Sequence, residues 1–322
     1  MKKTLLSKLI LGGAILFSLP LLFSSCGNED NPAVNPTPTP TPTPEGISYK
    51  AWNAGSTFDD KAAATYTEVT SSTTTWSEGT YVVNSDVTID GDVTLSGDVN
   101  LILCDGKTLT VNGSIQTEFD GSYNPINSLA VYAQSGGTGA LNITPSVDVP
   151  GIYAKNLNIH GGVISATVIG NEAGLESSNE MNIYAGTIIT AGGNGIMNYG
   201  PNVLSIYNAD ITATGITNGI QSATGIMMYS GSVMAMGGDA ASGTNYNGNS
   251  AISTAALTVN GGTLFAKGGA ADGTGSNGTG IDNTASISLG TGITFYEGTT
   301  ILGMAAVVTT PVTCSQQFVR IE

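Results

Sequence analysis

The stretch GIYAKNLNIHGGVISATVIGNEAGLESSNEMNIYAGTIIT, residues 151–190, contains one pattern twice. Each copy has three short segments in which apolar and polar residues alternate, and Gly, Asn, Ala or Ser separates the segments. Alternation with a period of two is typical of β-strands, and the small or polar residues between them are typical of turns. Each copy therefore predicts three short strands.

The same unit recurs along the following residues. Units begin at Gly151, Gly174, Gly195, Gly219, Ala251 and Gly280, with spacings of 23, 21, 24, 32 and 29 residues. Three strands in a repeat of this length predict one rung of a right-handed parallel β-helix, in which neighbouring rungs cover each other's apolar residues. The longer spacings come from two inserts, Asp239–Ser250 and Ala270–Thr279, which are rich in Gly, Asn and Ser and are expected to project as loops.

Aligning the units places apolar residues above one another in three inward columns. The first is Ile152, Leu175, Ile196, Ile220, Ile252 and Ile281; the second is Ile159, Ile183, Ile206, Met228, Val259 and Leu289; the third is Ile164, Ile188, Ile211, Val233, Leu264 and Ile293. These columns predict an all-β fold with an apolar, three-sided core.

Residues 81–113 show a stricter alternation, with turns of the Asp-Gly or Ser-Gly-Asp kind. The run YVVNSDVTIDGDVTLSGDVNLILCDGKTLTVNG resembles the opening of right-handed β-helices in secreted gut-bacterial proteins. Leu157–Ala166 and Leu257–Ala266 match the Gly-Gly repeats that follow in those proteins, so the resemblance covers roughly residues 76 to 300. More loosely, the chain is similar to β-helical carbohydrate-binding domains on bacterial surfaces, a group mostly of unknown function.

The two ends of the rod need protection, because an open end exposes strand edges and core. We expect residues 49–80, with Trp52, Phe58 and Tyr66, to cap the first rung, and residues 307–322 to cap the last. The β-helix itself is expected over residues 81–306.

The first residues predict export. A basic start (Met1-Lys2-Lys3), a mostly apolar run to Phe23 and Ser24-Ser25-Cys26 form a lipoprotein signal peptide over residues 1–25, with Cys26 as the lipidated residue. The site resembles the looser cleavage motif of Bacteroidetes lipoproteins. The following Gly27–Asn31 resembles the acidic tag that directs such proteins to the outer face of the outer membrane; a plain polar start to a linker is the alternative.

Residues 26–48 are expected to be a linker. Pro and Thr alternate from Pro36 to Pro44, which predicts a semi-rigid extended spacer about 30 Å long. Cleavage before Cys26 leaves six basic residues against 24 acidic ones, a formal net charge of −18. This charge disfavours nucleic acid and anionic membrane surfaces as partners. Cys104 and Cys314 are expected to be buried thiols and not a disulfide.

The chain lacks the residues of a polysaccharide lyase or hydrolase at the expected places. Its one Arg is Arg320, Lys107, Lys155 and Lys267 fall on separate rungs, and the acids of each outward column have neutral neighbours. The outward columns are Tyr153, Glu176, Met197, Gln221, Ser253 and Asp282, and Val163, Thr187, Asp210, Ser232, Thr263 and Gly292. We therefore expect no catalytic residues.

No cofactor or metal is predicted. His160 is the single His, so it is interpreted as a solvated turn residue and not a zinc ligand or catalytic base. Asp86, Asp90, Asp92, Asp98 and Asp105 could meet around calcium, but Asp is also the residue that caps turn amides, and their spacing favours this second role.

One outward column is aromatic. His160, Tyr184, Tyr207 and Tyr229 each follow a residue of the second inward column, and Asn260 comes next. With rungs roughly 4.8 Å apart they would form a ladder of rings. Such a ladder suits the faces of a glycan chain, and it also suits the mutual stabilisation of rungs; the second role predicts a ladder covered by the 239–250 insert or by another subunit.

Three functions follow, in this order. The first is a non-catalytic surface lipoprotein that binds glycans or acts as an adhesin through His160, Tyr184, Tyr207 and Tyr229. The second is a structural surface or matrix protein without a small ligand. The third, a polysaccharide-degrading enzyme, needs carboxylates that converge from loops. Beyond the membrane reached through Cys26 and a glycan, the sequence names no partner.

Overall fold

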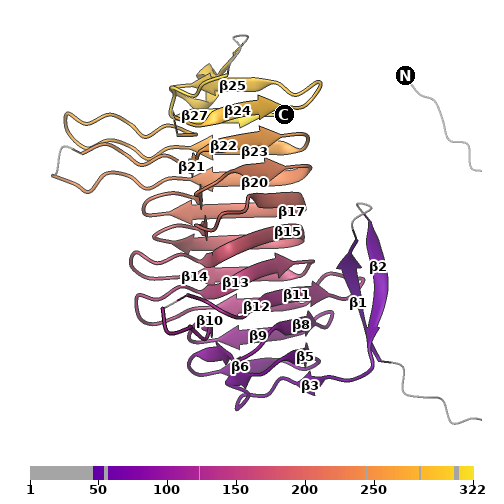
Figure 1. Cartoon of the computed structure of the whole chain (residues 1–322). Coiled ribbons are helices and arrows are strands. Elements are labelled where there is room, and N and C mark those ends of the chain that lie inside the picture. Colours follow the sequence, from indigo (N-terminus) through magenta and orange to yellow (C-terminus); the bar gives the residue numbers. More distant parts are fainter. Residues whose placement is uncertain (1–45, 54–56, 123, 244–245, 283, 308–311) are drawn as a thin grey trace, which may run out of the picture. The chain divides into compact units, whose positions relative to one another are not determined.

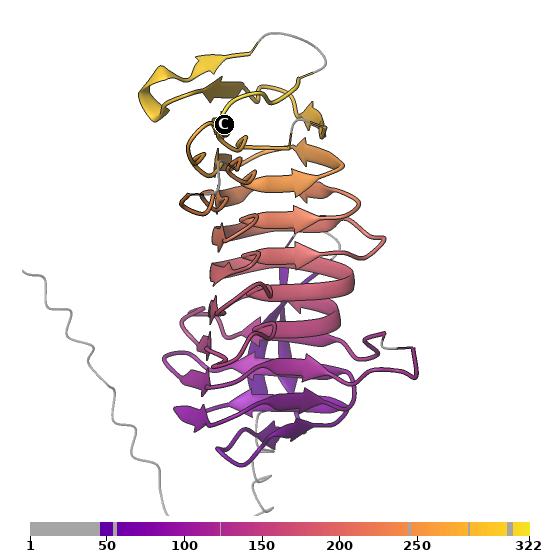
Figure 2. The same cartoon turned by 90° about the vertical axis from the view of Figure 1, so that its left-hand side faces the viewer.

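The computed structural model describes residues 46–53, 57–122, 124–243, 246–282, 284–307 and 312–322, which belong to one compact unit, Pro44–Glu322. The predicted signal peptide, Cys26 and the Pro-Thr run lie outside the described residues. Apart from a three-residue 3-10 helix, η1 (Ile301–Gly303), every regular element described is a β-strand. Figures 1 and 2 show the strands in layers that follow the sequence.

Most strands pair in parallel with strands one unit earlier and one unit later, and three faces result. Face 1 consists of β4 (Thr75–Trp76), β7 (Val93–Leu95), β10 (Ile115–Thr117), the first part of β13 (Ile152–Ile159), the first part of β15 (Leu175–Gly192), β16 (Ile196–Asn198), β18 (Ile220–Ser222) and β21 (Ile252–Thr254).

Face 2 contains the second part of β13 and the middle of β15. Its other strands are β3 (Thr67–Glu68), β5 (Gly79–Val83), β8 (Val99–Leu103), β11 (Leu129–Ala133), the first part of β17 (Leu204–Gly215), β19 (Ile226–Met228), β22 (Ala256–Val259) and β24 (Ser286–Leu289).

Face 3 contains the ends of β15 and β17. Its other strands are β6 (Val87–Ile89), β9 (Thr108–Val111), β12 (Ala140–Ile143), β14 (Val163–Thr167), β20 (Gly231–Met236) and β23 (Thr263–Lys267).

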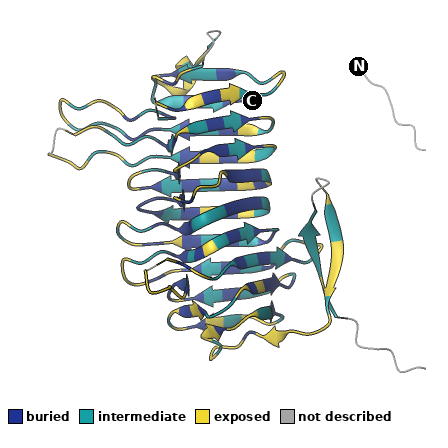
Figure 3. Cartoon of the chain, viewed as in Figure 1, coloured by how far each residue is buried: buried dark blue, intermediate teal, exposed yellow. Residues whose placement is uncertain are grey.

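The inward columns pair as the sequence predicts, with one exception. Every neighbouring pair of the first and second columns is in register. In the third column Leu264 pairs with Ile321 and not with Ile293. The reason is the tail, where β27 (Phe318–Ile321) runs antiparallel to β23 and takes the place that a further parallel strand would occupy. The column residues other than Leu289 and Ile293 belong to one continuous buried core, and these two are partly buried and pack against it. Buried residues are dark blue in Figure 3.

The tail and the start of the stack are closed differently. β27 also pairs antiparallel with β25 (Phe295–Gly298), and β25 pairs with β26 (Ala305–Ala306). At the start, Trp76 is fully buried and its ring stacks on Tyr81. The two inserts extend together from the stack in Figure 1 and exchange backbone hydrogen bonds, including Ala240 N–H to the Ala270 carbonyl at 2.8 Å.

The segment expected to cap the first rung lies partly elsewhere. β1 (Ile47–Trp52) and β2 (Phe58–Ala63) form an antiparallel hairpin with six residue pairs. This hairpin, hereafter the strap, stands beside the layers in Figure 1, and Lys50 in β1 pairs with Ala133 in β11. The polar, Thr-rich composition of residues 49–80 does not indicate that part of this segment lies beside the stack and not at its end.

Candidate binding site

Five rings are stacked on face 2 and are called here the aromatic column: Tyr132, His160, Tyr184, Tyr207 and Tyr229. Each directly follows an inward residue of a face 2 strand, so alternation turns it outward. Parallel pairing in register then sets the rings one above another on successive rungs. The sequence predicted four of these rings. Tyr132 was missed, although it follows the inward Val131 in the same way.

The ring spacings are close to one rung throughout. Centroid distances from Tyr132 to His160, His160 to Tyr184, Tyr184 to Tyr207 and Tyr207 to Tyr229 are 4.4, 4.6, 4.9 and 4.6 Å. The planes are nearly parallel, with interplanar angles from 6° to 28°. Asn260 continues the column as an exposed side chain.

The strap lies across the column through two aromatic residues. Tyr49 contacts Tyr132 edge-on, with centroids 4.9 Å apart. Trp52 stacks on Tyr184 at 5.7 Å and contacts Tyr207 at 5.3 Å. Among the described residues of the chain, the covering element is therefore the strap and not the 239–250 insert.

Coverage ends before the last ring. Tyr132, His160, Tyr184 and Tyr207 are half-buried, whereas Tyr229 keeps 40% of its surface exposed. The column thus has a covered part under the strap and an open end at Tyr229.

His160 is not the solvated turn residue that the sequence indicated. Its Nδ1 accepts a hydrogen bond of 2.9 Å from the backbone N–H of Trp52, and its ring lies between those of Tyr132 and Tyr184. Burial lowers the pKa of His160 to about 4, because the charged imidazolium would lose hydration there. Burial also raises the pKa of Tyr184 to about 12, with a smaller contribution from Tyr207.

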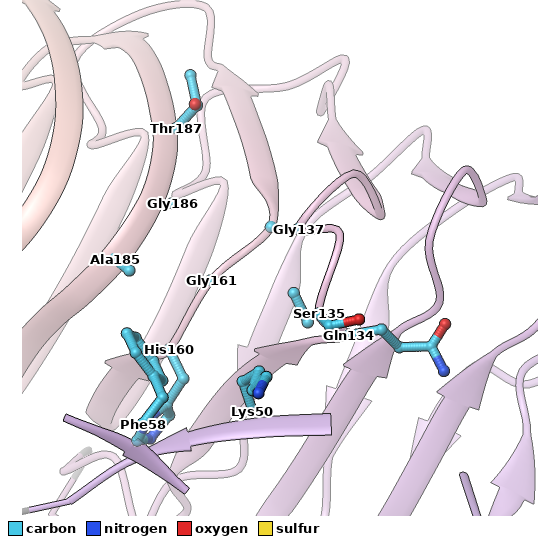
Figure 4. Close-up of a pocket in the computed structure, with 12 residues that line it drawn as sticks. Lys50, Phe58, Gln134, Ser135, Gly137, His160, Gly161, Ala185, Gly186 and Thr187 are labelled. Carbon is cyan, nitrogen blue, oxygen red and sulfur yellow. The ribbon is translucent and has the colours of Figure 1, made fainter. Parts of the chain in front are cut away.

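A groove of about 390 Å³ runs between the strap and the turns that follow face 2. Figure 4 shows Lys50 and Phe58 at the strap end of the groove and Thr187 at the other. Gly161, Gly162 and Gly186 line the groove. Because glycine has no side chain, these residues leave the space open. The remaining lining residues are Ala133, Gln134, Ser135, Gly137, His160 and Ala185.

The groove offers an aromatic ring beside several hydrogen-bonding groups. Phe58 supplies an apolar surface, and its ring meets that of Trp52 at 5.0 Å. Lys50 supplies a cation that pairs with Asp60 at 2.6 Å, and Gln134, Ser135 and Thr187 supply amide and hydroxyl groups. A few polar groups around an apolar surface are typical of small-ligand sites.

A second cluster lies on face 1. The Tyr153 ring is 5.5 Å from Phe119 and 6.3 Å from Tyr199, and the two tyrosine hydroxyls are hydrogen-bonded. A second pocket, of about 370 Å³, lies next to this cluster. It is lined by Asn124, Pro125, Lys155, Ser178, Asn179 and Tyr199.

Glu176 lies on the rung between Tyr153 and Tyr199, and it is buried although alternation predicts an outward position. Its register partners are Tyr153 and Met197, it is only 8% exposed, and its Oε2 has no hydrogen-bond partner. Burial raises the pKa of Glu176 to about 7, with a smaller contribution from Glu172. Tyr153 reaches past this rung to the hydroxyl of Tyr199, so the two joined tyrosines span the rung that carries Glu176.

The residues weighed for catalysis do not converge. Arg320 pairs with Glu322 at 3.2 Å and lies over the Tyr296 ring, 4.6 Å from its centroid. The early Asp side chains accept hydrogen bonds from backbone amides one rung away: Asp86 from Thr108, Asp92 from Ser114, Asp98 from Ser128 and Asp105 from Gly136. Among the described residues, no group of three or more His, Cys, Asp or Glu side chains is placed to hold a metal ion.

Cys104 and Cys314 are both buried free thiols. Cys104 belongs to a small separate cluster with Val82 and Ile102, against which Ile47, Tyr49 and Ala63 of the strap pack. Cys314 is in the main core. The strap therefore packs on the cluster that contains the Cys104 thiol, whereas the Cys314 thiol lies in the main core.

No protein-family model matches the chain, and neither a curated protein nor a solved structure is significantly similar to it. In the described part of the chain, no helix has the length and apolar character to cross a bilayer. Function is therefore inferred from the geometry and chemistry of the site itself.

Proposed function

We propose that this protein is a non-catalytic surface lipoprotein whose domain binds glycans along the aromatic column and the adjoining groove. We further propose that the three-faced parallel stack is a right-handed β-helix, and that the diacylglycerol on Cys26 anchors it to the outer face of the outer membrane. The signal, the acidic residues 29–30 and the Pro-Thr run support the anchor.

The observation that carries glycan binding is the open end of the aromatic column. Tyr229 is exposed while it lies 4.6 Å from Tyr207 with an interplanar angle of only 6°. The face of Tyr229 that is turned away from Tyr207 has no ring of the column stacked on it, and such an aromatic face suits the C–H face of a sugar unit. The other rings cover one another's faces, so they offer a glycan chain their edges and hydroxyl groups along the side of the column. The groove supplies hydrogen-bonding groups beside them. Adhesion to glycan-bearing surfaces follows from the same site.

The test is a glycan array with the soluble chain from Pro44 onward, which contains the whole compact unit. Retention of at least one glycan class that competes with soluble oligosaccharide supports the proposal. If the chain binds no host or dietary glycan on the array although cooperative melting shows that it is folded, the proposal is overturned.

A structural surface or matrix protein is the second candidate. The observation in its favour is the strap, because Tyr49 and Trp52 occupy the lower rings as an internal ligand would. On this alternative the column serves only to dock the strap, and Tyr229 has no ligand. The array separates the two candidates.

A further inference from the structure

The strap is attached to the stack by little backbone pairing, and its side-chain contacts are partly exposed to solvent. In the described part of the strap, Lys50 and Ala133 are the residue pair between β1 and β11. Side-chain hydrogen bonds to the stack include Trp52 N–H to His160, and Gln134 Nε2 to the Ser48 carbonyl at 3.2 Å. No residue of either strand is fully buried. An element with few buried contacts opens locally at a small fraction of the free energy of global unfolding.

The aromatic column does not depend on the strap for its geometry. The rings stand on face 2 strands whose backbones are paired in register and whose inward residues belong to the main core. The strap packs instead on the column and on the separate Val82, Ile102 and Cys104 cluster. If the strap leaves, the five rings keep their support.

Trp52 covers the side of the column at Tyr184 and Tyr207, where the stacked rings turn their edges and hydroxyl groups outward. It lies 5.7 Å from Tyr184 at an interplanar angle of 22°, within the range of ring stacking, and it also contacts Tyr207. A glycan chain that starts on the open Tyr229 and continues down the column meets Trp52 at the second ring. Ligand and strap therefore exclude each other at Tyr207 and Tyr184.

We propose that the column beneath the strap is a second, gated segment of the binding site, which an extended glycan reaches by displacing Trp52. This inference rests on the proposed glycan function and adds its regulation. In the closed state only the Tyr229 end and the groove are available. In the open state Tyr207, Tyr184, His160 and Tyr132 continue the site.

The gating makes affinity depend on ligand length. The observed Kd of a ligand that binds only the open state equals its intrinsic Kd divided by the fraction of molecules that are open. A change that loosens the strap raises this fraction and therefore lowers the observed Kd. A disaccharide that covers only the open end is insensitive to the strap.

The test compares the wild-type chain from Pro44 with its Trp52→Ala variant, using cellohexaose and cellobiose as probes in calorimetric titrations. Tyr246→Ala is the matched control, because Tyr246 is 70% exposed in the 239–250 insert. We expect Trp52→Ala to lower the Kd for cellohexaose about tenfold, or ~1.4 kcal/mol, and to leave cellobiose and the control unchanged.

Thiol labelling reports the strap directly. Saturating cellohexaose is expected to increase the rate at which a maleimide labels Cys104 several-fold, while Cys314 stays protected. Binding by the wild type with an equal or higher Kd for Trp52→Ala overturns the gate and leaves the glycan function standing. Absence of cellohexaose binding to both forms overturns the gate for this glycan chain, and the array alone decides the glycan function; binding by Trp52→Ala alone supports both.

Discussion

The backbone N–H of Trp52 donates a hydrogen bond of 2.9 Å to Nδ1 of His160, which lies 108 residues further along the chain. An accepting Nδ1 requires the neutral imidazole with its proton on Nε2. The same imidazole is stacked between Tyr132 and Tyr184. The single His of the chain therefore holds the strap to the aromatic column and is part of the column itself.

Acid should loosen the strap. The pKa of His160 is about 4 in the folded protein, against 6.5 for a freely solvated imidazole, so stability from the neutral ring is complete above pH 6.5 and is lost as the pH falls towards 4. We expect a loss of about 1–2 kcal/mol over this window, less than the full shift implies because the ring is partly solvated. Unfolding at pH 7 and pH 4.5 measures it.

The control for this prediction is His160→Gln, whose side-chain oxygen can accept the Trp52 hydrogen bond but does not titrate. Tyr132, Tyr184 and Lys50 surround His160, Lys50 pairs with Asp60, and the variant keeps all four of these groups. The difference between wild type and variant isolates the His160 contribution. Identical pH dependence in both proteins would rule that contribution out.

Removing the Trp52 ring should expose one thiol only. Cys104 is 8% exposed beneath the strap, whereas Cys314 is 2% exposed in the main core. In Trp52→Ala we expect maleimide to label Cys104 about tenfold faster in the absence of ligand, because more frequent local opening gives access. Cys314 provides the internal reference. Equal acceleration at both thiols would mean global destabilisation and not strap opening.

Glu176→Gln should stabilise the protein in mildly alkaline solution. The pKa of Glu176 is raised from 4.5 to about 7, so its contribution to stability is complete below pH 4.5 and is lost as the pH rises through 7. Gln has similar volume and no charge to bury, so the variant should be more stable by ~2 kcal/mol at pH 8 and equal at pH 4.5.

Glu118→Gln serves as the comparison for Glu176, because Glu118 is exposed. Its effect should stay within about 0.5 kcal/mol at both pH values. A Glu176→Gln variant whose stability at pH 8 does not exceed that of the wild type would show that the carboxyl group is solvated.

Asp105→Ala should destabilise the early rungs without any involvement of calcium. Asp105 accepts backbone hydrogen bonds from Gly136 at 2.8 Å and Thr138 at 3.1 Å. Their loss should cost about 1–2 kcal/mol in chemical unfolding. Because its oxygens are committed to amides, adding calcium or EDTA should leave the wild-type melting curve unchanged. A calcium-dependent rise that Asp105→Ala abolishes would indicate a metal site instead.

The repeat could be predicted from sequence because each rung carries its own local pattern. Inward residues such as Ile159 and Ile183 recur at the same place in every unit, and parallel pairing only has to keep them in register. The tail broke the pattern, since Ile321 pairs with Leu264 from an antiparallel strand that has no counterpart in the repeat. A single strand after the last unit gives no periodic signal of its direction.

The site was only partly predictable for a related reason. Alternation placed His160 and the three tyrosines outside the core, and the structure brings them together. What covers them depends on contacts between segments far apart in sequence, such as Trp52 with Tyr184 and Tyr207. Glu176 shows the same limit, because Tyr153 and Tyr199 on neighbouring rungs enclose a position that alternation assigns to solvent.

The most direct measurement for the aromatic column compares glycan affinity in Tyr229→Ala with that in Tyr246→Ala, using the strongest glycan from the array and recording melting temperature for each variant. Both residues are exposed tyrosines, but only Tyr229 stacks on the column. We expect Tyr229→Ala to lose about tenfold or more in affinity, or ~1.4 kcal/mol, while both variants melt close to the wild type. Unchanged affinity in Tyr229→Ala would contradict the proposal that the column binds glycans.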